Sequence, residues 1–214
     1  MSDQRYERDP ASIYRQSFDI VRREAELDRF PTDLQPVIVR LIHACGMVDI
    51  VEDIAFAPDV VAKAGSALQT GAAVFTDVEM VAAGIIRSRL PDKSDIVCTL
   101  NDPRVAAHAR EIGNTRSAAA VDYWDERLEG AVVAIGNAPT ALFHLLDRIE
   151  RGGPKPAAIL GFPVGFVGAA ESKQELILRE SGSSYLSLLG RRGGSAMASA
   201  AVNGLAAGLP ELDQ

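Results

Sequence analysis

Ala131-Val132-Val133-Ala134-Ile135-Gly136-Asn137-Ala138-Pro139-Thr140 is the stretch that decides the fold, because it joins an apolar run directly to a glycine turn and a proline. A short, continuous apolar run bounded by turn residues is typical of a parallel strand that is buried on both faces. Proline is favoured in the first turn of a helix, so Pro139 predicts that a helix starts there. We therefore expect a strand, a short loop and a helix in this order.

The loop between this strand and this helix is a candidate ligand site. Ligands of parallel α/β sheets bind beyond the carboxyl ends of the strands, and the free N–H groups of a helix start attract carboxylates or phosphates. Asn137 lies in that loop and is therefore a candidate binding residue. A tight strand-to-helix turn without any ligand explains the spacing equally well.

Similar apolar runs lie on both sides of this stretch, and helical stretches separate them. The runs span residues 72–75, 96–100 and 157–160, and a last one spans 185–189. The most evident helical stretches span 103–128 and 139–151. This alternation predicts an α/β fold, a three-layer sandwich in which helices cover both faces of a mainly parallel sheet.

Two helices are expected before these strands. Apolar residues recur among charges with a helical period over residues 11–29, and the pattern stops before Pro31. Thr32 and Asp33 offer an N-cap for a second helix, which Gly46 ends or bends. One apolar stripe of this second helix consists of Val37, Ile38, Leu41 and Ile42.

Length and composition limit the kind of protein. With 214 residues, 47% of them hydrophobic, the chain can bury one full core. We expect a single domain over residues 1–214, with N-terminal helices at about 11–46 and an α/β core at about 70–208. The net charge of −7 argues against nucleic-acid binding, because a phosphate backbone needs a dense cationic surface. No apolar run reaches the roughly 20 residues that span a bilayer, so no membrane partner is expected.

The cysteines and the N-terminal residues indicate a cytoplasmic protein. Cys45 and Cys98 have no CxxC spacing, which indicates neither a metal site nor a disulfide scaffold. Residues 1–7 alternate charges and lack the apolar segment of a secretory signal. We therefore expect a reduced, cytoplasmic protein that holds no metal.

His43 is the first candidate for catalysis. It is one of three histidines, and an imidazole has an ordinary pKa of about 6.5, which suits proton transfer near neutrality. Arg40 lies three residues before it on the expected helix. A hydrogen-bonded structural histidine remains the alternative. His108 and His144 lie in helical stretches with no acid–base partner nearby in the sequence, and we interpret them as structural.

Two glycine-rich segments near the C-terminus are candidate binding loops. Residues 161–168 follow a strand but lack the GxGxxG pattern, which argues against a dinucleotide site, and Lys173 downstream adds a cation. Residues 190–195 place Arg192 and Ser195 with glycine amides at a helix start, which favours an anion clamp. Without a ligand, these segments would be a loop over the edge of the core and a solvated charge pair.

Residues 114–117 combine hydroxyl groups with a guanidinium in an alanine-rich helical stretch. Arg116 and Ser117 are therefore further candidates for binding an anion. A buried salt bridge at Arg116 is the alternative explanation.

Five segments of the chain, taken in their order and spacing, carry a resemblance to one enzyme family. These segments are Ile42-His43-Ala44-Cys45-Gly46, Gly113-Asn114-Thr115-Arg116-Ser117-Ala118-Ala119-Ala120, Gly136-Asn137-Ala138-Pro139-Thr140-Ala141-Leu142, Gly161-Phe162-Pro163-Val164-Gly165-Phe166-Val167-Gly168-Ala169-Ala170-Glu171-Ser172-Lys173 and Gly193-Gly194-Ser195. Together they closely resemble the precorrin-8X methylmutase family over nearly the whole chain. The first ten residues and the tail after Pro210 add little to the resemblance.

The resemblance implies an isomerase of cobalamin biosynthesis. Such an enzyme moves a methyl group from carbon 11 to carbon 12 of precorrin-8X, a corrinoid tetrapyrrole, and gives hydrogenobyrinate. The step is formally a 1,5-sigmatropic shift, so neither a redox cofactor nor a methyl donor is expected. The resemblance also implies an α/β sandwich and a homodimer with its active site at the subunit interface. Hand-off of the product to the next enzyme is a further expectation.

Residue roles follow from the same resemblance. It implies that His43 is the proton donor or acceptor, and that Ser17 and Arg40 contact the substrate. Arg116 and Ser117 are the next choices for substrate contacts. Asn137, Lys173, Arg192 and Ser195 complete the set of expected substrate-binding residues.

Three other readings stay open at this point. If the substrate contains cobalt, as that of a related methylmutase does, the chain is a cobalt-precorrin-8 methylmutase. A corrinoid-binding carrier without catalytic activity would need the same anion clamps. A nucleotide-dependent α/β enzyme would bind NAD, FAD or ATP, although the chain shows no nucleotide fingerprint.

Overall fold

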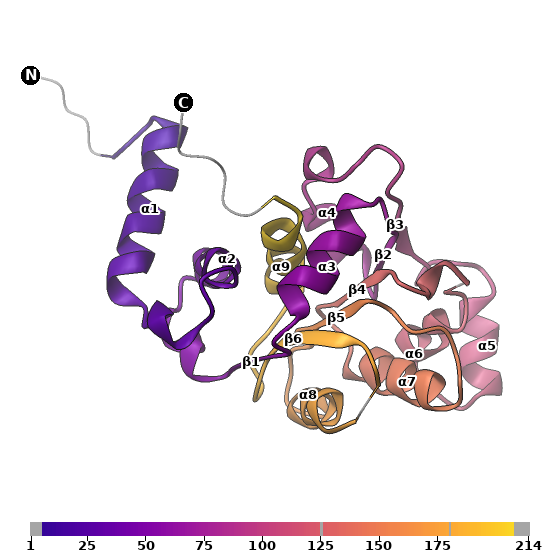
Figure 1. Cartoon of the computed structure of the whole chain (residues 1–214). Helices are drawn as coiled ribbons and strands as arrows, with labels where there is room; N and C mark the ends of the chain where they lie inside the picture. The colour runs from indigo at the N-terminus through magenta and orange to yellow at the C-terminus, as the bar shows by residue number, and fades with distance from the viewer. Residues whose placement is uncertain (1–5, 125, 180, 208–214) are drawn as a thin grey trace, which may run out of the picture.

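A mainly parallel sheet forms the centre of the molecule. The computed structural model describes residues 6–124, 126–179 and 181–207, and within these ranges it contains a six-stranded sheet in the order β1-β6-β5-β4-β2-β3 (Figure 1). The strands are β1 (Ile54–Phe56), β2 (Val74–Thr76), β3 (Ile96–Cys98), β4 (Val132–Ile135), β5 (Ala158–Gly161) and β6 (Ser184–Leu188). Every pairing is parallel except that of β1, which runs antiparallel to β6 at one edge. The predicted α/β class and the predominantly parallel sheet are confirmed.

Helices cover both faces of this sheet. Along β4, Val132 and Ala134 face a core shared with α2 (Gln35–Cys45), α3 (Val60–Gln69) and α9 (Ser195–Ala207). Val133 and Ile135 face a second core shared with α6 (Arg116–Val121), α7 (Pro139–Glu150) and α8 (Ala169–Leu178). Successive strand residues point to opposite faces, so an apolar run without alternation is what two covered faces require. Figure 1 shows the resulting three layers, with α3 and α9 on one side of the strands and α7 and α8 on the other.

The first expected helix is shorter than its sequence pattern. α1 (Pro10–Glu24) begins after Asp9, whose carboxylate accepts a hydrogen bond from the Ser12 N–H at 2.9 Å. It ends at Glu24, and a 3₁₀ turn, η1 (Leu27–Arg29), completes the range that the sequence predicts as one helix. Phe18 and Val21 are the buried residues of α1, which packs on α2 at one end of the molecule.

The second expected helix starts later than predicted. α2 begins at Gln35 with Leu34 as its N-cap, and no side chain caps it, so the predicted cap at Thr32 and Asp33 is wrong. Pro36 in the first turn fits an uncapped start, because its missing N–H needs no partner. Gly46, with φ 70°, ends the helix as predicted. The predicted apolar stripe of α2 is fully buried.

After the two N-terminal helices, the observed strands and helices differ from the predicted ones in two places. The predicted helix over 103–128 is broken into α5 (Val105–Glu111), α6 and a 3₁₀ turn, η4 (Glu126–Leu128). Gly113 has φ 62°, and Thr115 caps α6 by accepting from the Ala118 N–H at 3.2 Å, which explains the break. The sequence patterns do not predict β1, in which only three residues pair with β6. Because β1 and α3 lie before residue 70, the layered core begins earlier in the chain than predicted.

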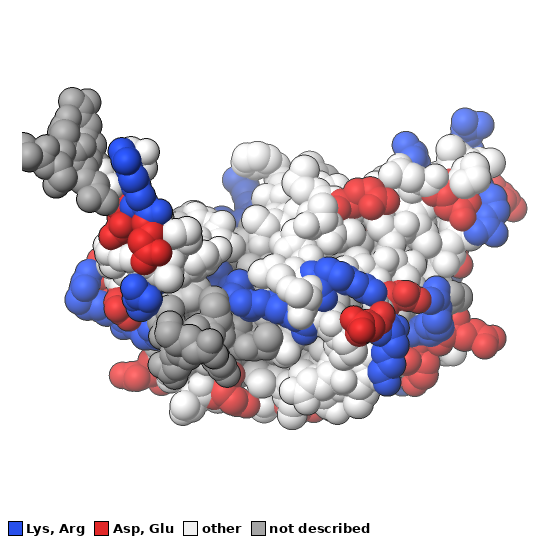
Figure 2. Space-filling model, turned by 90° about the horizontal axis from the view of Figure 1, so that it is seen from above, with Lys and Arg blue, Asp and Glu red and all other residues white. Residues whose placement is uncertain are grey.

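The remaining segments connect α2 with β1 and β2 with β3. They are η2 (Val48–Glu52), α4 (Glu79–Gly84) and η3 (Arg87–Arg89). A band of Lys and Arg side chains crosses the middle of the face seen from above (Figure 2), in a chain whose net charge is −7. Among the helices of the described ranges, none has the length and apolar character needed to cross a membrane.

Candidate functional site

His43 lies between two hollows, one on each side of α2. The first hollow, of about 420 Å³, lies between α1 and α2 and is lined by Ser17, Ile20 and Gly46 among others. The second hollow, of about 390 Å³, lies between α2, α4 and α9 and is lined by Arg40 and Ser199 among others. His43 lines both of them. The imidazole of His43 is therefore accessible from both hollows.

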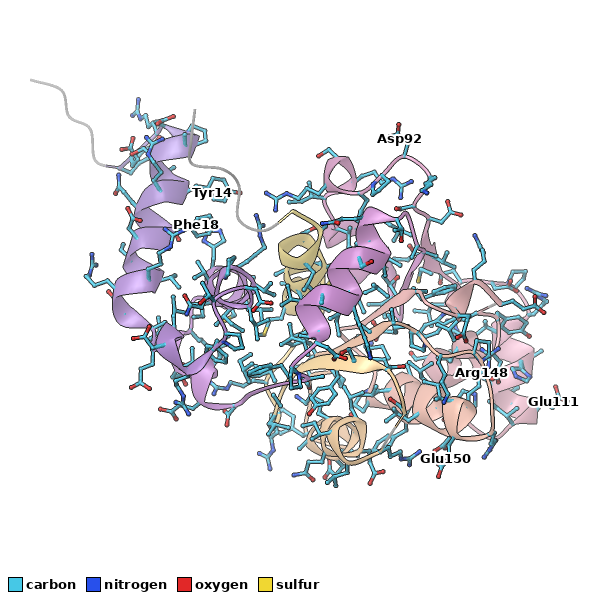
Figure 3. The ribbon with its side chains drawn as sticks, viewed as in Figure 1. Tyr14, Phe18, Asp92, Glu111, Arg148 and Glu150 are labelled. Atoms are coloured by element: carbon cyan, nitrogen blue, oxygen red, sulfur yellow. The ribbon has the colours of Figure 1, made fainter. Side chains whose placement is uncertain are left out.

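Side chains of α1 fix the orientation of this imidazole. The Ser17 hydroxyl oxygen lies 2.8 Å from His43 Nδ1, which is a hydrogen bond between residues 26 positions apart. The Phe18 ring meets the imidazole edge to face at a centroid distance of 5.1 Å, and the Tyr14 ring lies at 5.5 Å. Figure 3 shows Tyr14 and Phe18 projecting from α1 toward α2. No described residue forms a hydrogen bond with His43 Nε2.

The surroundings of His43 favour its neutral form. Burial lowers the pKa of His43, and the positive charge of Arg40 lowers it further. Arg40 is itself only 7% exposed, and burial together with the charge of Arg89 lowers its pKa to about 10. Its Nε is buried without a hydrogen-bond partner. A buried guanidinium N–H without a partner is costly, so this site is suited to an anion that enters the second hollow.

Asn203 and Arg89 belong to this site, although the sequence patterns do not single them out. Asn203 lies on α9, where its side chain accepts from the Ile86 N–H at 2.7 Å and donates to the Gly84 carbonyl at 2.9 Å. Arg89 donates to the Asn203 carbonyl at 3.2 Å. These bonds hold the segment between α4 and η3 against α9, beside Arg40. The one signal in the sequence is that Asn203 is an isolated amide in a helix of small residues.

The predicted residues Asn137 and Ser195 come together at the carboxyl end of β4. Asp77, directly after β2, accepts the N–H groups of Gly136, Asn137 and Ala138 at 2.9, 2.9 and 2.8 Å, and so holds the loop before α7. A Cβ on Gly136 would lie 2.7 Å from the Ser195 Cα, so only glycine permits this approach. Asn137 is exposed, and Ala196, next to Ser195, lines the second hollow with His43.

Arg116 and Ser117 lie at the same edge of the sheet. The Arg116 guanidinium donates to the Leu100 carbonyl at 3.0 Å, just beyond the end of β3, and the alternative of a buried salt bridge is not seen among its described contacts. Ser117 is half-buried in the first turn of α6. The Thr115 and Thr140 hydroxyls, 2.7 Å apart, join the starts of α6 and α7. Neither Arg116 nor Ser117 lines a hollow beside His43.

Lys173 and Arg192 differ from the expectation of cations that await a ligand. Lys173 is fully buried, and its Nζ donates to the Arg192 carbonyl at 2.7 Å, while burial lowers the pKa of the amine to about 8. The Arg192 guanidinium pairs with Asp49 at 2.6 Å and with Asp53 at 2.7 Å. Lys173 thus joins α8 to the loop before α9, and Arg192 joins this loop to the η2–β1 segment. Each cation has a hydrogen-bond or ion-pair partner within the protein.

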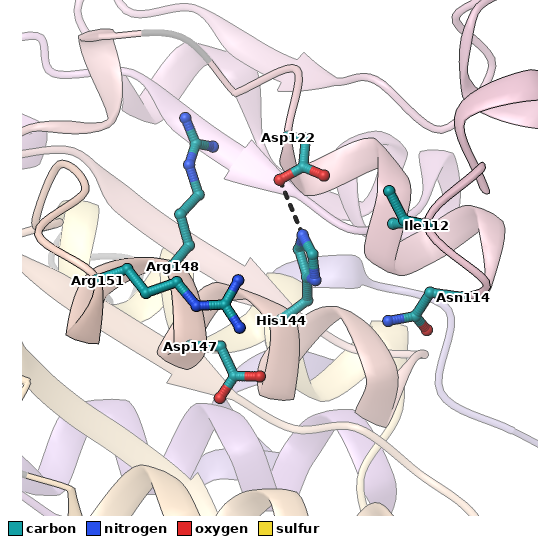
Figure 4. A pocket seen from close by; sticks show the side chains of 7 residues that line it. All are labelled: Ile112, Asn114, Asp122, His144, Asp147, Arg148 and Arg151. Carbon is teal, nitrogen blue, oxygen red and sulfur yellow. Dashed lines mark hydrogen bonds and ion pairs between the residues drawn. The ribbon is translucent and has the colours of Figure 1, made fainter.

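The other two histidines form a separate cluster on the opposite side of the sheet. His108 and His144 each place Nε2 2.8 Å from one oxygen of Asp122. His144 and Asp122, joined by this bond, line a hollow of about 380 Å³, with Arg148 and Arg151 on one side of His144 and Ile112 and Asn114 on the other (Figure 4). Within the described ranges, no group of three or more His, Cys, Asp or Glu side chains is arranged to hold a metal ion.

Comparisons with known proteins agree with this fold. A model of the precorrin-8X methylmutase family matches residues 12–207. The chain is 58% identical to a precorrin-8X methylmutase of Pseudomonas aeruginosa, over 94% of this chain and 97% of the relative. It is 37% identical to a cobalt-precorrin-8 methylmutase of Salmonella typhimurium, over 94% and 96%. A solved precorrin-8X methylmutase of Thermus thermophilus superposes with a TM-score of 0.82 at 37% identity, covering 91% of this chain and 94% of that one. The chain therefore belongs to the precorrin-8X methylmutase family.

Proposed function

We propose that this isomerase moves a methyl group from carbon 11 to carbon 12 of precorrin-8X and so forms hydrogenobyrinate. Membership of the family supports the methylmutase activity. The observation that carries the residue assignment is the imidazole of His43, which is oriented through Nδ1 and has no described partner at Nε2. It faces the same hollow as the buried guanidinium of Arg40.

The reaction is balanced within one molecule. The bond between carbon 11 and the methyl group breaks, the bond between carbon 12 and the methyl group forms, and the conjugated double bonds shift. Nothing is oxidised, so the reaction needs no electron acceptor. What the protein supplies is a proton and a fixed geometry for the substrate. A proton placed on the ring by His43, next to the migrating centre, makes the conjugated system electron-poor and favours migration, and the proton then returns to His43. A rigidly held substrate reacts as a single conformer.

Arg40 is our candidate for binding a carboxylate arm of the substrate. A carboxylate accepts charge-assisted hydrogen bonds from a guanidinium, and the partnerless Nε of Arg40 is a buried donor beside the second hollow. Met80, Ala196 and Ala200 give the same hollow an apolar wall for the face of the macrocycle. We propose Asn137, Ser195, Arg116 and Ser117 for the outer arms. The loop with Asn137 meets the start of α9 at Ser195, and Arg116, next to Ser117, binds the Leu100 carbonyl just beyond β3.

The size of the site favours a homodimer. The hollow beside Arg40 has a volume of about 390 Å³, at the lower end of the range for drug-sized ligands, and a corrinoid with its carboxylate arms is larger. We therefore propose that a second copy of the chain completes the site, with hand-off of the product to the next enzyme. We also propose a cytoplasmic location, on the grounds of the sequence.

The metal-free substrate is our choice over the cobalt-containing one. Two relatives named precorrin-8X methylmutase, from Pseudomonas aeruginosa and a Sinorhizobium species, are 58% and 54% identical to this chain. The relative from Salmonella typhimurium, named for cobalt-precorrin-8, is 37% identical. The higher identity to the first group supports precorrin-8X as the substrate.

The substitution His43→Ala tests the proposed function. We expect turnover of precorrin-8X to fall by at least about 100-fold, since general acid–base catalysis contributes on the order of 10²–10⁴. Affinity for hydrogenobyrinate should change little, because the anion-binding groups remain. The assay is the ultraviolet-visible spectrum, which changes with the conjugation of the ring, together with a titration of product binding.

His144→Ala is the matched control, because it removes an imidazole from the other side of the sheet. Undiminished turnover in His43→Ala would refute the acid–base role. A wild-type protein that binds hydrogenobyrinate but does not convert precorrin-8X would instead be a carrier.

A further inference from the structure

We propose that Ser17 is a positioning residue that holds the His43 ring and leaves Nε2 as the nitrogen presented to the macrocycle. This inference rests on the proposed function of His43. It differs from the role that the family resemblance implies for Ser17, which is a contact with the substrate. In the structure the Ser17 hydroxyl is engaged with the imidazole itself, at 2.8 Å from Nδ1.

The position of Ser17 is well defined by its helix. Its neighbour Phe18 is fully buried and Val21 is 6% exposed, so the middle of α1 is anchored on α2. Phe18 also lies edge to face against the imidazole, and Tyr14 lies against it one turn earlier. Two rings and one hydrogen bond, all from consecutive turns of α1, therefore restrict rotation of the imidazole about χ2.

A hydroxyl suits a histidine that must change its charge. Nδ1–H can donate to the Ser17 oxygen in both charge states of the ring. The neutral ring then has an unprotonated Nε2, and the charged ring carries its second proton on Nε2. Ser17 therefore stabilises the same ring orientation in both protonation states, while Nε2 takes up and releases the proton.

The other histidines of the chain show the contrasting arrangement. His108 and His144 are held by the Asp122 carboxylate, which can only accept a hydrogen bond, and this bond raises the pKa of His108. His43 is held by an uncharged group, and no carboxylate forms an ion pair with it among the described residues. The neutral partner leaves the charge of His43 free to change during a reaction cycle.

The charged and titratable groups around His43 agree with this arrangement. On α2 Arg40 faces it, on α1 Tyr14 contacts it, and Arg89 of η3 acts on Arg40. Glu24 and Glu7 line the hollow on the α1 side. Glu7 is engaged with the Arg8 and Asp9 N–H groups and the Ser12 hydroxyl, so it does not take the place of Ser17 as a partner of the imidazole.

The test combines kinetics with histidine NMR on the full-length protein. In protein with ¹⁵N-labelled histidine, the shifts of Nδ1 and Nε2 report where the ring proton lies, and His43→Ala assigns the His43 signals among those of three histidines. We expect the neutral ring of wild-type His43 to carry its proton on Nδ1. Ser17→Ala should mix the two tautomers and lower kcat by about 10-fold with KM nearly unchanged, since one hydrogen bond is lost.

Two further variants sharpen the result. Ser17→Thr keeps a hydroxyl and should restore the Nδ1–H tautomer and most of kcat. Ser12→Ala removes an exposed hydroxyl from the same helix and should change neither the tautomer nor kcat.

A Ser17→Ala protein with unchanged His43 shifts and a raised KM would overturn the proposal and assign Ser17 to substrate binding. A failure of the proposed function would look different, because wild-type protein would then lack turnover while the tautomer measurement would still give its answer.

Discussion

At the scale of single residues, burial and then the charge of Arg40 lower the pKa of His43. Arg40 lies one helical turn before His43, and both line the second hollow. A nearby positive charge disfavours a second one, so it acts together with burial to lower the pKa of His43. A substrate carboxylate that pairs with Arg40 would offset this effect and let His43 hold a proton when the macrocycle is bound.

The substitution Arg40→Met tests this coupling. Methionine keeps an unbranched side chain at position 40 but removes the positive charge, so the pKa of His43 should rise toward its ordinary value. Affinity for hydrogenobyrinate should fall, because a carboxylate partner is lost. NMR titration of the His43 ring measures the first effect and an absorbance titration the second. Arg22→Met is the control, since it removes an exposed charge from α1. An unchanged pKa of His43 in Arg40→Met would contradict the coupling.

At the scale of elements, one carboxylate joins three helices on the side of the sheet opposite His43. Asp122 follows α6 and binds His108 of α5 and His144 of α7. The hydrogen bond to Asp122 raises the pKa of His108 above 6.5, although desolvation opposes it. Burial disfavours the charged form of Asp122, but the bonds from His144 and His108 outweigh it and lower its pKa below 3.8.

These two shifts define a pH window for the stability that the cluster contributes. The part due to His108 is fully present below its ordinary pKa of 6.5 and is lost as the pH rises through the raised folded value. The part due to Asp122 is present above 3.8 and is lost as the pH falls through the lowered folded value. The contribution is therefore largest between these ordinary values, in mildly acidic solution.

Asp122→Asn should consequently lower the melting temperature more at about pH 5.5 than at about pH 9. Thermal unfolding followed by circular dichroism at several pH values measures the difference from wild type. Asp95→Asn is a matched control, because Asp95 pairs with Arg127, which stays charged throughout this range. A difference between Asp122→Asn and wild type that is constant with pH would show that the cluster does not titrate as described.

At the scale of the whole molecule, α1 is a largely exposed helix in which only Phe18 and Val21 are buried. It stands at one end of the molecule and packs on α2, away from the sheet (Figure 1). Ile13, Tyr14 and Ile20 on this helix are 45%, 44% and 43% exposed, next to the hollow that contains His43. An uncovered apolar surface beside an incomplete site is what a second copy of the chain would cover.

Sedimentation equilibrium should therefore give twice the mass of the chain for the wild-type protein. Ile20→Asp places a charge on the exposed face of α1 and should shift the protein toward monomer, with a loss of turnover that grows on dilution. Leu178→Asp is the control, because Leu178 is 76% exposed on α8, away from α1. A monomeric wild-type protein with full activity would contradict the proposed dimeric site.

The sequence by itself determined most of the elements and their layering. Runs such as Val132–Ile135 predict buried strands because local hydrophobic patterns and turn residues reflect the burial of each element. The patterns failed where local signals compete, as over 103–128, where a single helical period continues across the turn at Gly113. The candidate histidine and Arg40 were also visible, because both lie on one predicted helix.

Only the tertiary structure decided which side chains meet. The contact between Ser17 and His43 spans 26 residues, and Asn203 reaches the Ile86 N–H across 117, so no local pattern encodes either of them. Lys173 and Arg192 look like free cations in the sequence, yet packing buries the first and gives carboxylate partners to the second. The physical reason is that a pattern along the chain reports how much of each residue is buried, whereas its partners depend on how distant elements pack against one another.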